Sequence, residues 1–448
     1  MSYIFRDVQW NLEQTVKHRG KQNNIILIEG PRQVGKTTLV RETLKALHRP
    51  YLEFNLEARP DLAHKIDACQ NFKEFTEFVE LAFPFPIGGE KILFLDEAQE
   101  SAKLGQYVRF MKEEWDFTLV ILSGSSMARI FREARYPVGR VTPIPVQPFS
   151  FKEFLRASDH AALVKKIEEV KRIDLLSSWS HETHQLFLSQ LEKYMEVGGL
   201  PEVVIEYFSK GSWNQTRENL LYGYYQDFRR VYGESFQAYL TAVLKTTAHL
   251  LGMPFKNSHV ATLLDGGKNQ KIIEALSQLE AWKMIRIVEQ RGTGVEGNFH
   301  PKRYVFDIGI ARQLRESALP SLSLLNSTDP GQRQPLGGVI ENVVANALVA
   351  FLDTLTGWKK ASSGSEVDFV VKMGGHTFPV ECKAALKIKN SHLYGVQDFL
   401  KIHSLKIGVI ISLAPFEIRD LSDRQKVVLV PLYLVDFLKE ILHGIKSE

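Results

Sequence analysis

The sequence has few of the features that mark secreted or membrane-bound proteins. Only two of its 448 residues are cysteines, Cys69 and Cys382. A disulfide framework is therefore excluded, and a reducing compartment is expected. No apolar run reaches the roughly 18 residues that a membrane span needs. The N-terminus has no basic segment followed by an apolar one, so no signal peptide is expected. We predict a cytoplasmic protein that does not bind membranes.

An excess of charge is also lacking. Lysine and arginine number 56 and the acids 52, a net charge of +4, which does not by itself imply a nucleic-acid partner. Hydrophobic residues make up 44% and charged residues 24%, as in an ordinary globular protein. A chain of this length exceeds one hydrophobic core, so we expect roughly two to four domains.

The most informative stretch is a phosphate-binding loop near the N-terminus. Residues 30–37 match G-x-x-x-x-G-K-[ST], with an apolar strand at 25–28 before them and a helix at 39–47 after them. Backbone N–H groups of such a loop point at a bound anion. Lys36 is expected to reach the β- and γ-phosphates, and Thr37 to coordinate magnesium. The predicted nucleotide contacts are Gly30, Pro31, Arg32, Gln33, Val34, Gly35, Lys36, Thr37 and Thr38.

A pair of carboxylates follows a second apolar strand. Residues 92–95 run directly into Asp96 and Glu97. Ligands of parallel sheets bind at the carboxyl ends of the strands, so both acids are expected beside the phosphate loop. Asp96 is predicted to hold the magnesium shell. Glu97 is predicted to orient or deprotonate the attacking water.

Another buried strand, 118–122, ends in a Ser-Gly-Ser-Ser segment. A serine there can contact the γ-phosphate or the water, or it can cap the next helix, as Ser125 or Ser126 would. The phosphate loop, the Leu-Asp-Glu-Ala-Gln at 95–99, this serine segment and Gly139-Arg140 together resemble a prokaryotic AAA+-like ATPase family. That resemblance implies a sensor role for Ser125 and makes Arg140 a candidate phosphate or subunit-interface arginine.

The middle of the chain reads as helical and then as a winged helix-turn-helix. Residues 160–245 show helical spacing, and the segments 194–202 and 224–227 resemble the same ATPase family. Helices are expected at 257–264 and 269–284, and strands 285–289 and 302–306 are expected to pair as the wing. The module is slightly basic. It is either a DNA-binding unit, with Lys268, Lys271, Lys302 and Arg303 on its nucleic-acid face, or an internal packing unit.

The last part of the chain has the order αβββαβ. A helix at 338–351 carries Glu341, and strands are expected at 358–362, 366–371, 378–383 and 405–411, with a helix at 391–403. Asp368 followed by Glu381-x-Lys383 resembles the PD-(D/E)XK restriction-endonuclease-like superfamily. Members of the ATPase family often carry such a domain, catalogued as a domain of unknown function. The resemblance implies that Asp368 and Glu381 share magnesium or manganese, that Lys383 positions water and that Glu341 completes the outer shell. Charged residues on an exposed strand are the alternative.

The sequence therefore predicts an α/β protein built around a P-loop parallel sheet. The expected parts are an ATPase domain (1–155), a helical region (156–250), a winged helix-turn-helix (251–312), a linker (313–335) and a nuclease-like domain (336–448). The first hypothesis is an ATP- and magnesium-dependent ATPase that acts on or near DNA and can form homo-oligomers. The second is a nucleotide-switched interaction protein with a non-catalytic nuclease-like domain. A metabolic kinase is a third, although the helical and winged regions suggest no substrate pocket.

Overall fold

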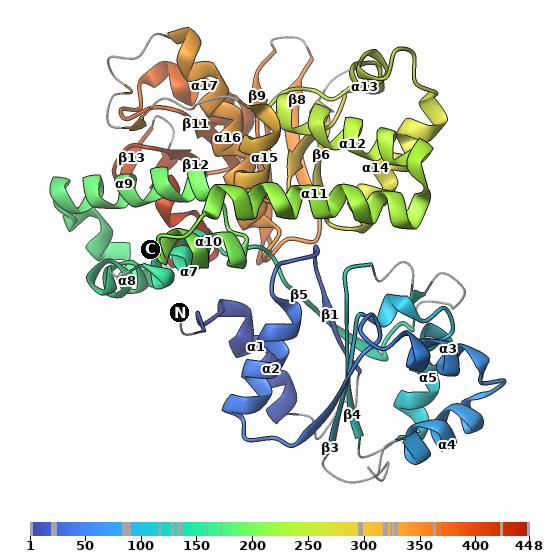
Figure 1. Ribbon diagram of the computed structural model, residues 1–448. Helices are drawn as coiled ribbons and strands as arrows, with labels where there is room; N and C mark the ends of the chain where they lie inside the picture. Colours follow the sequence, from blue (N-terminus) through green and yellow to red (C-terminus); the bar gives the residue numbers. More distant parts are fainter. Residues whose placement is uncertain are drawn as a thin grey trace. The chain divides into compact units, whose positions relative to one another are not determined.

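The structure is a computed structural model, drawn in Figure 1. It describes residues 3–18, 25–82, 91–115, 118–126, 130–131, 137–158, 160–171, 173–293, 299–316, 321–322, 325, 330–361, 364–421 and 424–445. Two compact units are present, Met1–Gln147 with Ala281–Lys283, and Pro148–Glu280 with Met284–Glu448. No helix among these described residues is long and apolar enough to cross a membrane.

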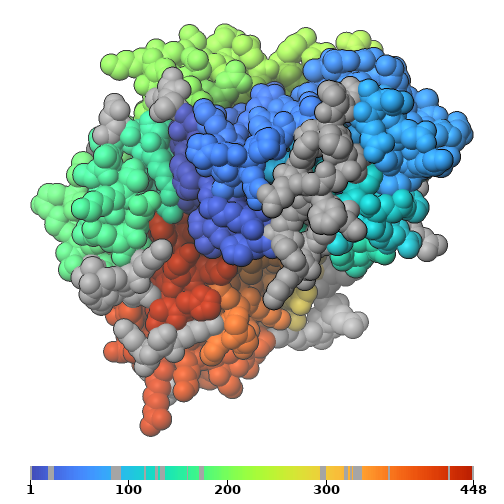
Figure 2. Space-filling view, turned by 90° about the horizontal axis from the view of Figure 1, so that it is seen from below, coloured from blue at the N-terminus to red at the C-terminus, as the bar shows by residue number. Residues whose placement is uncertain are grey.

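The first unit is built on a parallel sheet of five strands in the order β2-β3-β4-β1-β5. The predicted parallel sheet is confirmed. Its strands are β1 (Ile25–Glu29), β2 (Tyr51–Asn55), β3 (Lys91–Asp96), β4 (Thr118–Gly124) and β5 (Val141–Pro145). The surface of this unit is blue to cyan in Figure 2.

Helices cover both faces of this sheet (Figure 1). They are α1 (Asp7–Lys17), α2 (Lys36–Ala46), α3 (Pro60–Ala68), α4 (Phe72–Ala82) and α5 (Leu104–Glu114), with a 3-10 turn η1 (Ala98–Glu100). Alternate residues of a strand face opposite sides of the sheet. Accordingly Leu27, Leu93 and Leu122 share one core with the apolar side chains of α3, α4 and α5. Burial on both faces explains why the strands read as continuous apolar runs.

The second unit begins with a helical region, as predicted for 160–245. Its helices are α7 (Phe151–Ala157), α8 (Ala161–Glu168), α9 (His181–Val197), α10 (Pro201–Phe208), α11 (Trp213–Tyr232) and α12 (Glu234–His249), with 3-10 turns η2 (Glu169–Lys171) and η3 (Ile173–Ser178). Ser150 starts α7 through a capping box with Glu153, which satisfies two N–H groups that the helix cannot pair itself.

The Gly198-Gly199 segment between α9 and α10 docks on Asp307. The Asp307 carboxylate accepts N–H groups from Gly199 at 2.7 Å and from Ile310 at 2.9 Å, so it also caps α15 (Ile308–Arg315). Gly198 has a φ of +87°, and a Cβ there would lie 2.6 Å from Asp307 Oδ1. The segment 194–202, which resembles the ATPase family, is thus held by Asp307 at the start of α15.

Helices and strands lie close to those expected for residues 257–306, while the winged helix-turn-helix fold itself stays a prediction. These are α13 (Asn257–Leu263), α14 (Asn269–Ala281), β6 (Ile285–Thr293) and β7 (Lys302–Val305), and β6 and β7 pair antiparallel. However, β6 also pairs in parallel with β8 (Leu355–Lys360), and β8 pairs with β9 (Glu366–Val367). The resulting four-stranded sheet, β7-β6-β8-β9, joins the wing to the C-terminal region.

The remaining elements surround a second five-stranded sheet, β10-β11-β12-β14-β13. Its strands are β10 (Phe369–Met373), β11 (His376–Lys383), β12 (Ile407–Ser412), β13 (Glu417–Asp420) and β14 (Lys426–Pro431). The helices are α16 (Pro330–Leu348), α17 (Tyr394–Ile402) and α18 (Leu438–Ile445), with 3-10 turns η5 (Asn390–Leu393) and η7 (Leu432–Phe437). Both α15 and α16 extend into the span 313–335 that was predicted to be a linker. The strand expected at 366–371 is divided at Asp368 into β9 and β10.

Candidate nucleotide site and C-terminal ion cluster

The phosphate loop lies where the carboxyl ends of the parallel strands meet. It follows β1 and leads into α2, whose N-cap is Gly35 with a φ of +85°. Gly30 lies against the segment that follows β5, and a Cβ on Gly30 would be 2.0 Å from the carbonyl oxygen of Val146. The two glycines are therefore needed for different reasons, Gly30 for close approach and Gly35 for a left-handed backbone.

The Lys36 ammonium is buried within the loop. It donates to the carbonyl oxygens of Gly30 at 3.1 Å and Pro31 at 2.8 Å. Burial lowers the pKa of Lys36 to about 8, although the carboxylates of Glu97 and Asp96 favour the charged form. A phosphate group would supply the full negative charge that these carbonyls lack.

Asp96 is the centre of a polar network at the strand ends. Its carboxylate accepts hydrogen bonds from the Thr37 hydroxyl at 2.8 Å, from the Asn55 amide at 3.0 Å and from the Ser123 hydroxyl. Asp96 is completely buried. The two residues predicted as magnesium ligands, Thr37 and Asp96, are thus brought together, and their oxygens suit a hard divalent cation.

Glu97 follows Asp96 in a left-handed backbone conformation, with φ +50° and ψ +45°. Such a conformation is uncommon for a residue with a side chain, and it is found preferentially at functional sites. The carboxylate accepts from the Gln99 amide at 2.5 Å. Burial raises the pKa of Glu97 above its usual value, while Lys36 opposes the shift. A raised pKa is the direction expected of a proton acceptor that works near neutral pH.

Other predicted residues of this site have different surroundings. Arg32 forms an ion pair with Glu57 at 2.8 Å. Ser125 is half-buried after β4, whereas the serine that contacts Asp96 is Ser123. Sequence reasoning missed both Ser123 and Asn55. Each could have been found as a polar residue at the end of a strand: Ser123 ends β4, which pairs with β1, and Asn55 ends β2, which pairs with β3.

Arg140 lies at the opposite edge of the sheet from the phosphate loop. Its carbonyl accepts from Ile25 at the start of β1, while the loop follows the end of that strand. Five strand residues separate the two edges by about 16 Å. The Arg140 guanidinium binds Glu113 at 2.8 Å. The prediction that Arg140 contacts phosphate in its own chain is therefore wrong, because the side chain cannot span that distance.

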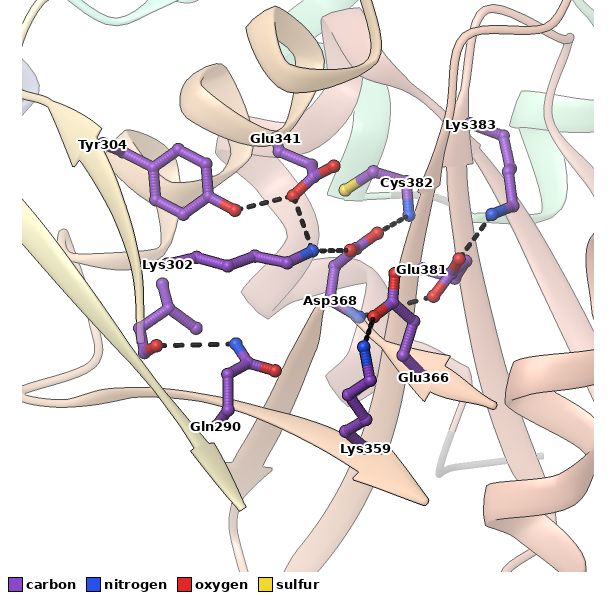
Figure 3. Close-up of polar contacts among 11 residues, drawn as sticks. Gln290, Lys302, Tyr304, Glu341, Lys359, Glu366, Asp368, Glu381, Cys382 and Lys383 are labelled. Atoms are coloured by element: carbon purple, nitrogen blue, oxygen red, sulfur yellow. Dashed lines mark hydrogen bonds and ion pairs between the residues drawn. The ribbon is translucent and has the colours of Figure 1, made fainter. Parts of the chain in front are cut away.

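The four predicted nuclease residues do converge in the second unit (Figure 3). Asp368 occupies the break between β9 and β10, and its backbone N–H donates to Glu381 at 3.3 Å. The Asp368 carboxylate accepts from the Cys382 N–H at 2.9 Å, and Lys383 pairs with Glu381. Glu341 approaches from α16. Cys382, between Glu381 and Lys383 on β11, is buried.

A residue that sequence reasoning placed elsewhere completes this group. The Lys302 ammonium, from β7, lies between Asp368 at 2.7 Å and Glu341 at 3.1 Å, and the Tyr304 hydroxyl donates to Glu341 at 2.6 Å (Figure 3). Lys302 is only 4% exposed. We call this set the C-terminal cluster; its members are Lys302, Tyr304, Glu341, Asp368, Glu381 and Lys383.

The prediction that Lys302 lies on a nucleic-acid-binding face of the wing is wrong, because this side chain is buried in the C-terminal cluster. Arg303 points to the other face of β7 and lies over the Phe255 ring, 4.6 Å from its centroid. Lys271 similarly lies over Tyr239. The strand pattern carried a signal for Lys302, since alternation puts it on the same face as the apolar bodies of Tyr304 and Phe306.

Charges within the C-terminal cluster are balanced internally. Burial and the nearby Asp368 raise the pKa of Glu341 to about 7 and that of Glu381 to about 8. Burial opposes the charge on Lys302, but Asp368 and Glu341 outweigh it and raise the lysine's pKa well above its usual value. Lys302 is therefore an ammonium ion at neutral pH, in direct contact with Asp368 and Glu341.

The C-terminal cluster does not fit a divalent cation in this arrangement. The Lys302 ammonium already binds Asp368 and Glu341, and Lys383 pairs with Glu381. The second Glu341 oxygen faces Gly252 so closely that a Cβ on that glycine would lie 2.8 Å from it. Within the described ranges, no group of three or more His, Cys, Asp or Glu residues is arranged to hold a metal. The prediction that Asp368 and Glu381 share an ion finds no support in this geometry.

Comparison with protein families separates the N-terminal part of the chain from the rest. Residues 22–155 match the family described as an AAA domain. Residues 188–321 and 336–433 match two families described as domains of unknown function. No curated protein matches the chain.

Two solved structures show a distant likeness. A Walker-type ATPase of Pyrococcus abyssi is 18% identical, with a TM-score of 0.44 over 70% of this chain and 96% of that one. The RuvB Holliday junction branch migration motor of Thermotoga maritima is 16% identical, with a TM-score of 0.29 over 71% and 96%. TM-scores this low carry no weight for function. The AAA match, which spans the whole phosphate-loop site, identifies the N-terminal part as a P-loop ATPase domain, and the protein as an ATPase.

Proposed function

We propose that this ATPase hydrolyses magnesium-ATP as a nucleotide switch. The observation that carries the proposal is the 2.8 Å hydrogen bond between the Thr37 hydroxyl and the Asp96 carboxylate, beside the Lys36 ammonium. Bound magnesium neutralises the charge on the phosphates. Thr37 and Asp96 are the residues that would hold it.

The chain's own residues have separable tasks in turnover. Lys36 exchanges the Gly30 and Pro31 carbonyls for phosphate oxygens, which restores the full charge of a lysine whose pKa burial has lowered to about 8. Glu97, whose pKa burial raises, orients the water and accepts its proton. Ser123 and Asn55 fix the Asp96 carboxylate so that one face of it stays directed at Thr37.

We propose that the C-terminal part is nuclease-like in fold but acts as a non-catalytic docking unit. The order of its elements supports the PD-(D/E)XK fold: α16, then β8 to β11, then α17 and β12. The position of Lys302 supports the absence of metal-dependent cleavage, because its ammonium already pairs with Asp368, one of the two carboxylates that would bind the ion, while Lys383 pairs with the other, Glu381. Mixed pairing of β6 with β7 and β8 supports a wing that packs internally.

A metal-dependent nuclease acting on DNA is the second candidate. It is favoured by the convergence of Glu341, Asp368, Glu381 and Lys383 in one place, which a set of unrelated surface charges would not show. For this candidate Lys302 would have to leave the carboxylates before magnesium or manganese entered. Cytoplasmic location, homo-oligomer formation and a subunit-interface role for Arg140 stay predictions.

One experiment separates the two candidates. The purified full chain is incubated with plasmid, single-stranded DNA and RNA, with ATP and either magnesium or manganese. We expect ATP turnover without cleavage, and the same result for the variant Asp368→Ala. Cleavage by the wild-type protein that Asp368→Ala abolishes would establish the nuclease. Equal cleavage by both would point to a contaminating enzyme, and the docking role would stand.

A further inference from the structure

The buried side chain of Arg6 is not part of any predicted site, yet it binds the phosphate loop. Arg6 is 3% exposed and lies just before α1. Its guanidinium donates from Nη1 to the Val34 carbonyl at 2.9 Å and from Nη2 to the Gln147 carbonyl at 2.7 Å. One planar fork therefore joins three segments that are far apart in the sequence.

The contact with Val34 has a direct consequence for the phosphate-binding surface. In a trans peptide the C=O and the following N–H point in opposite directions. Holding the Val34 carbonyl outward on Arg6 therefore directs the N–H of Gly35 to the other side of that peptide. That N–H belongs to the loop whose inward-pointing donors bind an anion. The positive charge also polarises the peptide and strengthens the N–H as a donor.

The contact with Gln147 anchors the guanidinium from its other side. The preceding residue, Val146, donates to the Glu29 carbonyl at 2.7 Å and packs against Gly30. The start of the phosphate loop is thus hydrogen-bonded and packed against the 146–147 segment, and Arg6 joins the end of the loop to that same segment. A lysine would supply the charge but lacks the planar fork that serves two carbonyls at fixed angles.

We propose that Arg6 is a positioning residue of the nucleotide site, which orients the Val34–Gly35 peptide for the phosphates of ADP and ATP. The Gly35 N–H contacts phosphate both before hydrolysis, with ATP, and after it, with ADP, because both nucleotides occupy the same loop. The contact is therefore equally strong in the ground state and in the transition state. Loss of such uniform binding raises KM and leaves kcat unchanged. A purely structural role for Arg6 would instead reduce the folded, active fraction and so lower the apparent kcat at constant KM.

The test compares Arg6→Met with a matched control, Arg109→Met. Arg109 is 62% exposed in the same unit and pairs with Glu113 away from the loop. We expect Arg6→Met to weaken ADP binding and raise KM for ATP on the order of tenfold, which corresponds to about 1.4 kcal/mol, with kcat close to wild type. Arg109→Met should change neither constant.

A conservative variant keeps the test decisive if Arg6→Met does not fold. Arg6→Lys retains the charge and the apolar stem, and should bind ADP several-fold more weakly than the wild type. ADP affinity is measured by titration calorimetry on samples whose folded fraction is established by circular dichroism. Wild-type affinity in Arg6→Lys, or a fall in kcat with unchanged KM in Arg6→Met, would overturn the proposal.

Discussion

Replacing Lys302 with methionine tests how the C-terminal cluster is held together. The substitution preserves most of the side-chain volume and removes the ammonium from Asp368 and Glu341. Removing one partner of a buried ion pair costs about 3–5 kcal/mol, because an uncompensated charge remains. Glu341 can relieve part of this by taking a proton, since its pKa is already about 7. Asp368 retains the Cys382 N–H. We therefore expect the free energy of unfolding to fall by about 3 kcal/mol, near the lower end of this range.

The assay must report on the second unit alone, because a chain of two units need not unfold in one step. Hydrogen exchange under native conditions meets this need. Peptides covering β7 and β10 should lose protection in Lys302→Met, while peptides covering β1 serve as an internal reference. Lys268→Met is the matched variant, because Lys268 is exposed in the same module. Its effect should lie within about 0.5 kcal/mol.

A double-mutant cycle gives the decisive result. In Asp368→Asn the charge that Lys302 chiefly compensates is gone, so the combined variant should cost less than the sum of the single variants. Residues in direct contact show coupling energies of about 0.5–3 kcal/mol, and we expect roughly 2 kcal/mol here. Additive costs, or unchanged exchange in Lys302→Met, would refute the internal ion cluster.

Three further outcomes follow from the structure. Lys36→Ala should abolish ATP binding, and Glu97→Gln should bind ATP but stall turnover; equal hydrolysis by wild type and Glu97→Gln would refute the role of Glu97. Gly30→Ala should lose nucleotide affinity and about 1–3 kcal/mol of stability, because a Cβ meets the Val146 carbonyl at 2.0 Å; calorimetry and urea unfolding measure both. Burial lowers the pKa of His184, which contacts the Tyr433 hydroxyl at 2.8 Å. Neutral His184 contributes its full stability above the unfolded pKa of about 6.5, and this contribution is lost as the pH falls through the lower folded pKa. His184→Gln should therefore reduce the fall in stability below about pH 6.5.

Local sequence signals located the phosphate loop and the acidic end of β3, but not the other residues around them. The phosphate loop and the Asp96-Glu97 pair each lie within a few residues at the end of an apolar strand, and a parallel sheet brings such ends to one edge. Ser123 and Asn55 were not identified, because a polar residue near a strand end has no distinctive spacing. The phosphate contact of Arg140 could be proposed because no strand was predicted at 141–145; once β5 is known to be parallel to β1, a residue just before it lies at the amino edge, away from the phosphate loop.

The C-terminal cluster could be predicted only in part. Glu381 and Lys383 lie two residues apart on one strand, so alternation alone put them on the same face. Lys302 meets Asp368 across 66 residues and Glu341 across 39, and no local pattern determines such a pairing. Its role depends on β6, which pairs with β7 on one side and with β8 on the other.

That shared strand changes what a winged module can do in this protein. A wing that reads nucleic acid must present its basic side chains to solvent. Here Lys302 faces inward, Arg303 lies on Phe255, and β6 is committed to a sheet with β8. Contact with DNA would then depend on α14, whose exposed positions are Asn269, Gln270, Ile273, Glu274 and Ser277. None of these is basic, and the nearest cations are the exposed Lys268 just before α14 and the half-buried Lys271. Few phosphate contacts are therefore available for counterion release, the main source of affinity for DNA. This segment is better suited to linking the helical region to the C-terminal sheets than to binding a phosphate backbone.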